Sequence, residues 1–210
     1  MSGKGLLTAS LIAVTTLLTS AFGQKNEIAV GVGRTFIANQ GIKAGAIPLL
    51  NNTVHFGNGL SFELNYARHL AGNPIYRLDA EVPFIGNPDE NLASGNGGVP
   101  SQYSVYFLAP SARVKLVPDN VVQPWVSIGG GYGRFNMNRT LVYGGANPGP
   151  STKNSGVVEG GVGLDVRTFK WAGIRLAARD FWSGALPLNV NTGKTRQHNM
   201  VVTGGLVFKF

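Results

Sequence analysis

The sequence has 210 residues, of which 43% are hydrophobic, only 13% are charged and none is cysteine. An ordinary soluble domain has roughly 25% charged residues and about 7% glycine, whereas this chain has 30 glycines. The length corresponds to one domain with a formal net charge of +8, and the lack of cysteine excludes a disulfide scaffold, a thiolate metal site and a cysteine nucleophile.

The first 23 residues have the pattern of a secretory signal peptide. Lys4 gives a short basic start, residues 6–18 are dominated by Leu, Ile, Ala, Val and Thr, and small residues follow at Ala21 and Gly23. This apolar run is shorter than the roughly 20 residues of a membrane-spanning helix. We therefore expect cleavage after Gly23 and a mature domain over residues 24–210. No later stretch approaches such a run, so a mature chain in a membrane would cross it without helices.

Apolar and polar residues alternate along most of the mature chain. Alternation places successive side chains on opposite faces of a strand. In residues 75–84, for example, Arg77, Asp79 and Glu81 alternate with apolar residues. In chain order, we expect eight strands at 28–36, 60–67, 75–84, 103–117, 121–135, 158–169, 173–182 and 200–210.

The connections between these strands alternate between long and short. Long connections of about 15 to 21 residues are expected at 38–58, 86–102, 138–154 and 184–198, and short turns at 69–73, 118–120 and 170–171. An up-and-down meander with its long loops at one end is typical of a transmembrane β-barrel. A soluble lipocalin-like barrel, apolar inside and polar outside, is the alternative.

The positions of the charges favour the membrane barrel. Only Arg34, Arg68, Arg134 and Asp180 fall on the apolar faces, mostly near strand ends. A cation that faces lipid at the midplane costs about 2–4 kcal/mol, so the apolar faces should face lipid. The interior of an eight-stranded barrel is just wide enough for side chains to fill. We predict that it is filled by an ionic network of Glu63, Arg77, Asp79, Glu81, Arg113, Lys115, Glu159, Asp165, Arg167, Arg175, Arg179 and Lys209.

This network predicts a barrel without an open diffusion pore. Unpaired ions in a narrow lumen would be costly, so we expect the acids and bases to pair. In particular, the charges at 77–81 should pair with Arg113 and Lys115 on the next strand. Aromatic residues near strand ends are expected to form girdles at the two membrane interfaces, and they are Phe36, Phe56, Tyr103, Trp125, Tyr143, Phe169, Trp171, Phe181, Trp182 and Phe210.

The last strand ends in Phe208-Lys209-Phe210, which resembles the C-terminal signature of bacterial outer-membrane barrels. The glycine-rich segment 123–135 also resembles the fifth strand of such proteins. Residues 24–210 therefore resemble the small eight-stranded outer-membrane barrels of the OmpA/OmpX type. The resemblance implies an all-β antiparallel barrel in the outer membrane, surrounded by outer-membrane lipid and lipopolysaccharide. It also implies that the barrel assembly machinery reads Phe210. We expect a monomer.

Some barrels of this architecture are enzymes that act on lipid A with a Ser/His pair and an acid. Here His55 and His198 fall in expected external loops and His69 in a turn. Asp180, three residues before Ser183, stands where such enzymes would keep a histidine. A hydroxyl nucleophile needs an adjacent base, so we expect no enzyme. The scattered histidines have no metal-ligand spacing, and the glycine clusters do not open a nucleotide-binding helix, so we expect no metal and no cofactor.

The leading functional hypothesis is a non-enzymatic barrel that serves envelope integrity or surface interaction through its four long loops. Two alternatives remain. One is a conduit for small apolar or amphipathic molecules, in which residues 46–50 would line an apolar vestibule; the other is a lipid A-modifying enzyme. A continuous apolar pocket would favour the conduit, and a lumen filled by paired ions to the rim would favour the closed barrel. We expect lipopolysaccharide phosphates, not nucleic acid, to be met by the loop cations Lys43, Arg139, Lys153, Lys194 and Arg196.

Overall fold

The computed structural model describes residues 25–43 and 53–210. The predicted signal peptide and the predicted vestibule segment 46–50 lie outside the described residues. Among the residues described, no helix is long and apolar enough to cross a membrane.

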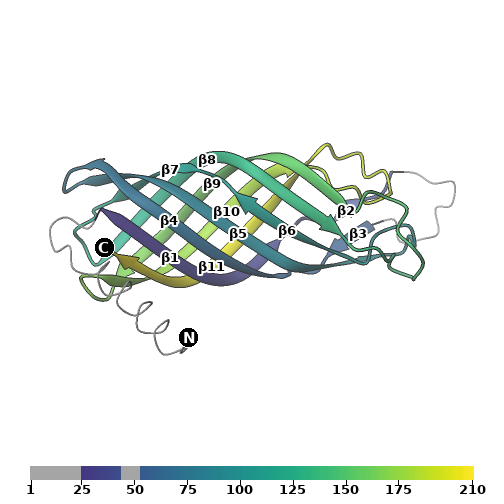
Figure 1. The fold of residues 1–210 in the computed structure, drawn as a ribbon, viewed down its shortest axis with the longest axis horizontal. Helices are drawn as coiled ribbons and strands as arrows, with labels where there is room; N and C mark the ends of the chain where they lie inside the picture. Colours follow the sequence, from purple (N-terminus) through teal and green to yellow (C-terminus); the bar gives the residue numbers. More distant parts are fainter. Residues whose placement is uncertain (1–24, 44–52) are drawn as a thin grey trace, which may run out of the picture.

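The described residues form one antiparallel sheet that closes on itself (Figure 1). β1 (Asn26–Phe36) pairs with β11 (Arg196–Lys209) on one side and with β4 (Leu60–Gly72) on the other, which closes the ring. The wall continues through β5 (Tyr76–Ser94), β6 (Gln102–Leu108), β7 (Ser111–Leu116), β8 (Val122–Met137), β9 (Thr152–Arg167) and β10 (Ala172–Gly184). The predicted antiparallel up-and-down barrel is confirmed.

β6 and β7 together occupy one position in the wall. Both pair with β5 on one side and with β8 on the other. The break between them falls at Ala109 and Pro110, and proline has no N–H to donate to a ladder. The strand predicted over 103–117 is therefore interrupted, and the ring still has the eight predicted positions.

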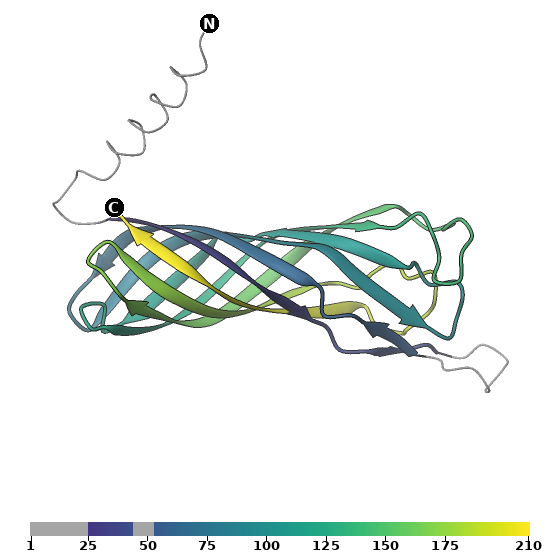
Figure 2. The same cartoon turned by 90° about the horizontal axis from the view of Figure 1, so that it is seen from below.

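The strands extend further toward the long-loop end than predicted. β5 continues to Ser94, through the expected loop 86–102, and β9 already begins at Thr152. A register shift between Asn87 and Glu90 accommodates the turn-like residues 87–89 as a bulge within β5. Short strands β2 (Gln40–Gly41) and β3 (Thr53–Phe56) extend from the barrel within the expected loop 38–58. In Figure 2 they lie at the end opposite to the C-terminus.

The wall separates apolar from polar side chains as the alternation predicts. On β4, the side chains of Leu60, Phe62 and Leu64 are exposed on the outer surface, whereas those of Ser61 and Glu63 are buried inside. The exposed fraction is 61% for Leu60 and 4% for Glu63. Because the outer face of the wall is apolar, the sequence suits a barrel whose surroundings are hydrocarbon.

Candidate functional site

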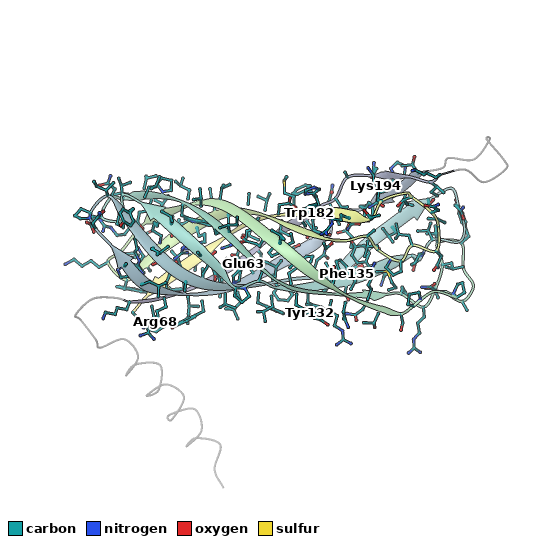
Figure 3. All side chains as sticks on the ribbon, turned by 90° about the horizontal axis from the view of Figure 1, so that it is seen from above. Glu63, Arg68, Tyr132, Phe135, Trp182 and Lys194 are labelled. Atoms are coloured by element: carbon teal, nitrogen blue, oxygen red, sulfur yellow. The ribbon has the colours of Figure 1, made fainter. Side chains whose placement is uncertain are left out.

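The interior of the barrel has two layers (Figure 3). Charged side chains fill the part that includes Glu63, which we call the ionic layer. Apolar side chains around Phe135 fill the part nearer to the long loops, which we call the apolar layer. On β5 and β10 the same strand contributes to both layers, because inward-facing residues change from ionic, as at Glu81 and Arg179, to apolar, as at Ile85 and Phe181.

One half of the ionic layer is built on Glu27 and Asp165. Lys115 Nζ lies 2.6 Å from Asp165 Oδ2 and 3.0 Å from Glu27 Oε2. Arg175 Nε lies 2.7 Å from Asp165 Oδ1, and the same guanidinium also pairs with Glu27. Arg113 Nη2 lies 2.8 Å from Glu27 Oε1. Two carboxylates from β1 and β9 are thus held by three cations from β7 and β10.

The other half is built on Arg179. Its guanidinium lies 3.2 Å from Glu63, 2.8 Å from Glu81 and 2.7 Å from Glu159. Arg113 connects the halves, because its Nη2 also lies 2.7 Å from Asp79 Oδ2 and its Nη1 lies 3.4 Å from Glu81 Oε2. The network therefore spans the lumen from wall to wall.

The indole of Trp125 is buried among these ions. Its Nε1 donates a hydrogen bond of 3.2 Å to Asp165 Oδ1. The guanidinium carbons of Arg179 and Arg175 lie 4.9 and 5.3 Å from the ring centroid, which is cation–π geometry. Space for the ring comes from Gly163 on β9, because a Cβ there would lie 2.2 Å from Trp125 Cζ2.

Nine of the twelve predicted lumen residues are buried within the ionic layer, all except Arg77, Arg167 and Lys209. Arg77 lies nearer the short turns, with its Nε 2.7 Å from Asp79 Oδ1. Lys209 Nζ donates to Gln123 Oε1 over 3.1 Å. Arg167 is not part of the network. It is the last residue of β9 and donates to the Asp119 carbonyl in the neighbouring turn.

The predicted pairing between neighbouring strands is only partly what the structure shows. Arg113 pairs with Asp79 and Glu81 as expected. Lys115 instead reaches Glu27 and Asp165. It does so because a lysine in a narrow lumen can extend to strands other than its neighbours.

The sequence reasoning missed Glu27 and misplaced Trp125. Glu27 is the inward-facing residue before Ala29 on β1. Starting the expected strand at residue 27 instead of 28 would have placed it in the lumen. Trp125 was expected in an aromatic girdle. The girdle prediction is also wrong for Phe56, Tyr103 and Phe181, which are buried, because it used proximity to strand ends and not parity. The aromatic residues that do face outward include Phe36, Tyr143, Phe169, Trp171 and Trp182.

The apolar layer is packed with aromatic rings. The rings of Phe107 and Phe181 stack with their centroids 4.6 Å apart, and Phe107 meets Phe135 edge-on at 5.8 Å. Tyr103 packs on Phe135 at 6.2 Å. The layer is therefore neither filled by paired ions to the rim nor an open apolar vestibule. Its other buried members include Val54, Ile85, Leu92, Val99, Val105, Met137, Leu186, Leu188 and Val201.

The long loops close over the apolar layer and hold one another. Asn189 Nδ2 donates to the Gly98 carbonyl over 3.1 Å and to Asn147 Oδ1 over 2.7 Å, which joins three loops. The Lys43 N–H donates to the Asn191 carbonyl over 2.7 Å, which adds the first loop. We call this assembly of residues 42–43, 95–101, 138–151 and 185–195 the cap.

All three histidines lie on strands, not in loops or turns as predicted, because the strands are longer than expected. His55 lies on β3 and His69 on β4. His198 lies on β11 with its exposed side chain on the outer surface, and its Nδ1 is 2.5 Å from Asp180 Oδ2. Ser183 lies on the opposite, inner face and is fully buried. This serine is therefore separated from the Asp180–His198 pair by the barrel wall.

No family model matches the sequence, and no curated protein matches it. Among solved structures, Neisserial surface protein A has a TM-score of 0.52 and 14% identity over 88% of this chain and 97% of that chain. AlkL in lipid bilayers has a TM-score of 0.50 and 15% identity over 91% and 93%. At these identities the chains share the fold. The present chain has the fold of the small eight-stranded outer-membrane β-barrels, as its resemblance to the OmpA/OmpX type implied.

Removing the Arg179 side chain tests the energetic role of the ionic layer. Arg179→Ala leaves Glu63, Glu81 and Glu159 without their shared cation, and uncompensated buried charge costs about 3–5 kcal/mol. We expect the free energy of unfolding in detergent micelles, measured by urea titration, to fall by that amount. The control is Arg134→Ala on the exposed outer surface of β8, which should change it by less than about 1 kcal/mol. Equal effects of both substitutions would contradict this role.

Proposed function

We propose that the chain is a non-enzymatic outer-membrane barrel without an open pore, which presents its cap as a defined surface to the exterior. The observation that carries this proposal is the ionic layer, because its ion pairs extend across the lumen. A solute that passed through would have to separate pairs such as Arg179–Glu159, at 2.7 Å. Breaking buried pairs in this way costs several kcal/mol.

The cap supports a role at the surface. Its loops are fixed to one another by the bonds of Asn189 and Lys43, so they present one shape to a partner instead of several independent chains. Lys43, Arg139 and Lys194 lie in the cap, where cations would meet the phosphates of lipopolysaccharide. We further propose that Phe210 guides assembly; it exchanges two backbone hydrogen bonds with Asn26 where β11 meets β1.

Conductance in planar lipid bilayers tests the closed barrel. We expect the purified, refolded protein to insert without steady channel openings, because the ion pairs of the ionic layer extend across the lumen. A general porin, treated in the same way, serves as the positive control. Stable, ohmic steps from the wild-type protein would overturn the proposal.

The conduit for small apolar molecules is a second candidate, and a gap in the wall favours it. Backbone pairing between β9 and β10 ends at Val157 and Ser183, although β9 begins five residues earlier at Thr152. Beyond that point the strands are joined by Gly184 N–H, which donates to Ser155 Oγ over 2.9 Å, and by Lys153 Nζ, which donates to the Ala185 carbonyl. We call this unpaired stretch the seam. Val157 and Phe181 of the apolar layer lie at its inner side.

A disulfide across the seam distinguishes the two candidates. A Cβ at Gly184 would lie 4.0 Å from Ser155 Cβ, within the range for a disulfide, and the chain has no other cysteine. If the seam is a passage, oxidised Ser155→Cys/Gly184→Cys should lose uptake of a hydrocarbon probe into proteoliposomes and regain it on reduction. If the barrel is closed, the oxidised, reduced and wild-type proteins should all give the uptake of empty liposomes.

A further inference from the structure

A groove of about 740 Å³ lies at the seam, and residues of both faces of the wall line it. Gly156 and Val158 of β9 face outward there, and Gly184 of β10 lies on the other side of the seam. A Cβ at Gly156 would meet nothing within 4 Å, so this glycine leaves the groove open. The remaining lining residues are Gly131, Ser155, Val157, Thr195 and Arg196.

One cation lines the groove, and a second lies next to it. Arg196 lines it from β11, and Gly184 is its partner in the ladder. Lys153 Nζ reaches the seam from β9, where it would lie 4.0 Å from a Cβ at Gly184. Arg196, Lys194 and His198 also line a smaller adjoining hollow of about 140 Å³. The groove therefore has a positive border at its cap side.

The Arg196 side chain is held in place by an aromatic stack. Its guanidinium carbon lies 4.6 Å from the Trp182 ring centroid, and Trp182 stacks on His198 at 6.0 Å. His198 in turn contacts Asp180, the carboxylate that faces this cluster from β10. Asp180 makes its contact with His198, and no carboxylate of the described residues forms a salt bridge with Arg196, so its guanidinium can bind a ligand.

The stack lies where the apolar outer surface ends. Toward the middle of the barrel, the outward residues on the same strands are apolar and exposed, as at Leu176, Met200 and Val202. Toward the cap the next outward residue is Arg196. Figure 3 shows Trp182 and Lys194 on the cap side and Arg68 at the opposite end. Tryptophan is enriched at the headgroup level of a bilayer, so cations just beyond it lie at the depth of lipid phosphates.

We propose that this groove binds one molecule of a phosphorylated saccharolipid of the lipid A class. Arg196 binds a phosphate from the outer side of the wall, and Lys153, whose ammonium lies at the seam, binds it from the inner side. Guanidinium and ammonium groups form charge-assisted hydrogen bonds with phosphate oxygens. An acyl chain lies over Gly156 and along the exposed Val158. The long loops of outer-membrane barrels face the exterior, so the groove opens to the leaflet that holds this lipid. The inference rests on the membrane-embedded barrel of the proposed function but not on its closed lumen.

The phosphate contact is tested by lipid titration. Purified protein in detergent is mixed with bis-phosphorylated lipid A, and the bound fraction is measured by native mass spectrometry. We expect one lipid per chain, and Arg196→Gln or Lys153→Gln should each weaken binding by about tenfold. Arg196→Lys, which keeps the charge, should recover part of it. Arg68→Gln, which removes one exposed cation at the opposite end, should leave binding unchanged.

The acyl contact is tested by filling the groove. Gly156→Leu should abolish one-to-one binding, whereas Gly160→Leu is the matched control. Gly160 is an outward-facing glycine on the same strand, also with nothing within 4 Å of its Cβ position, and it does not line the groove. All variants should retain the urea midpoint of the wild type.

Two results would overturn the proposal. One is equal lipid A binding by the Arg196→Gln and Arg68→Gln variants, which would mean that the overall positive charge of the protein, and not a specific site, holds the phosphate. The other is equal binding of phosphatidylglycerol and lipid A, which would mean that the groove selects any anionic lipid. Channel activity in the conductance experiment would overturn the closed barrel and leave this binding result unaffected, so the two failures are distinguishable.

Discussion

The barrel depends on the pairing of buried charges inside a wall whose outer face is apolar. Six carboxylates, from Glu27 to Asp165, are buried in the lumen and pair with cations there. Four of the acids are held by cations from two strands; Glu27, for example, is held by side chains of β7 and β10. The other two, Glu63 and Glu159, both pair with Arg179. The network therefore connects side chains of strands from all around the ring. Removing one shared cation leaves several buried carboxylates without a partner.

Alternation predicted the wall because a strand has only two faces, and a one-residue error would invert both. This is why nine predicted lumen residues lie together, although they are scattered from Glu63 to Arg179. Alternation says nothing of depth along the barrel, so the change from ionic to apolar layer could not be predicted. Strand ends were also misjudged, since bulges and cap-side extensions carry the same Gly, Asn and Pro residues as loops. The prediction that His198 lies in a loop is wrong for this reason, since the residue is part of β11.

The long-loop end of the barrel differs from the ionic half in its interior, which is apolar, and in its wall, which contains the seam. Rings such as Phe107 and Phe181 fill the interior below the cap. In the wall beside it, the seam replaces backbone ladder bonds with the side-chain contacts of Ser155 and Lys153. A groove with cations at the lipid boundary results. A closed lumen and a lipid-binding wall are compatible, because the first depends on the ionic layer and the second on the groove at the seam, which is lined by other residues.

The assignment of faces is tested most directly by spin-label accessibility in lipid bilayers, since the chain has no native cysteine. Single cysteines at Val162 and Leu176 should be reached by oxygen dissolved in the hydrocarbon and shielded from a water-soluble nickel chelate. Cysteines at Ser127 and Thr203, which are buried inside, should be shielded from both reagents. Nickel access to positions 127 and 203 would show a water-filled lumen and contradict the account.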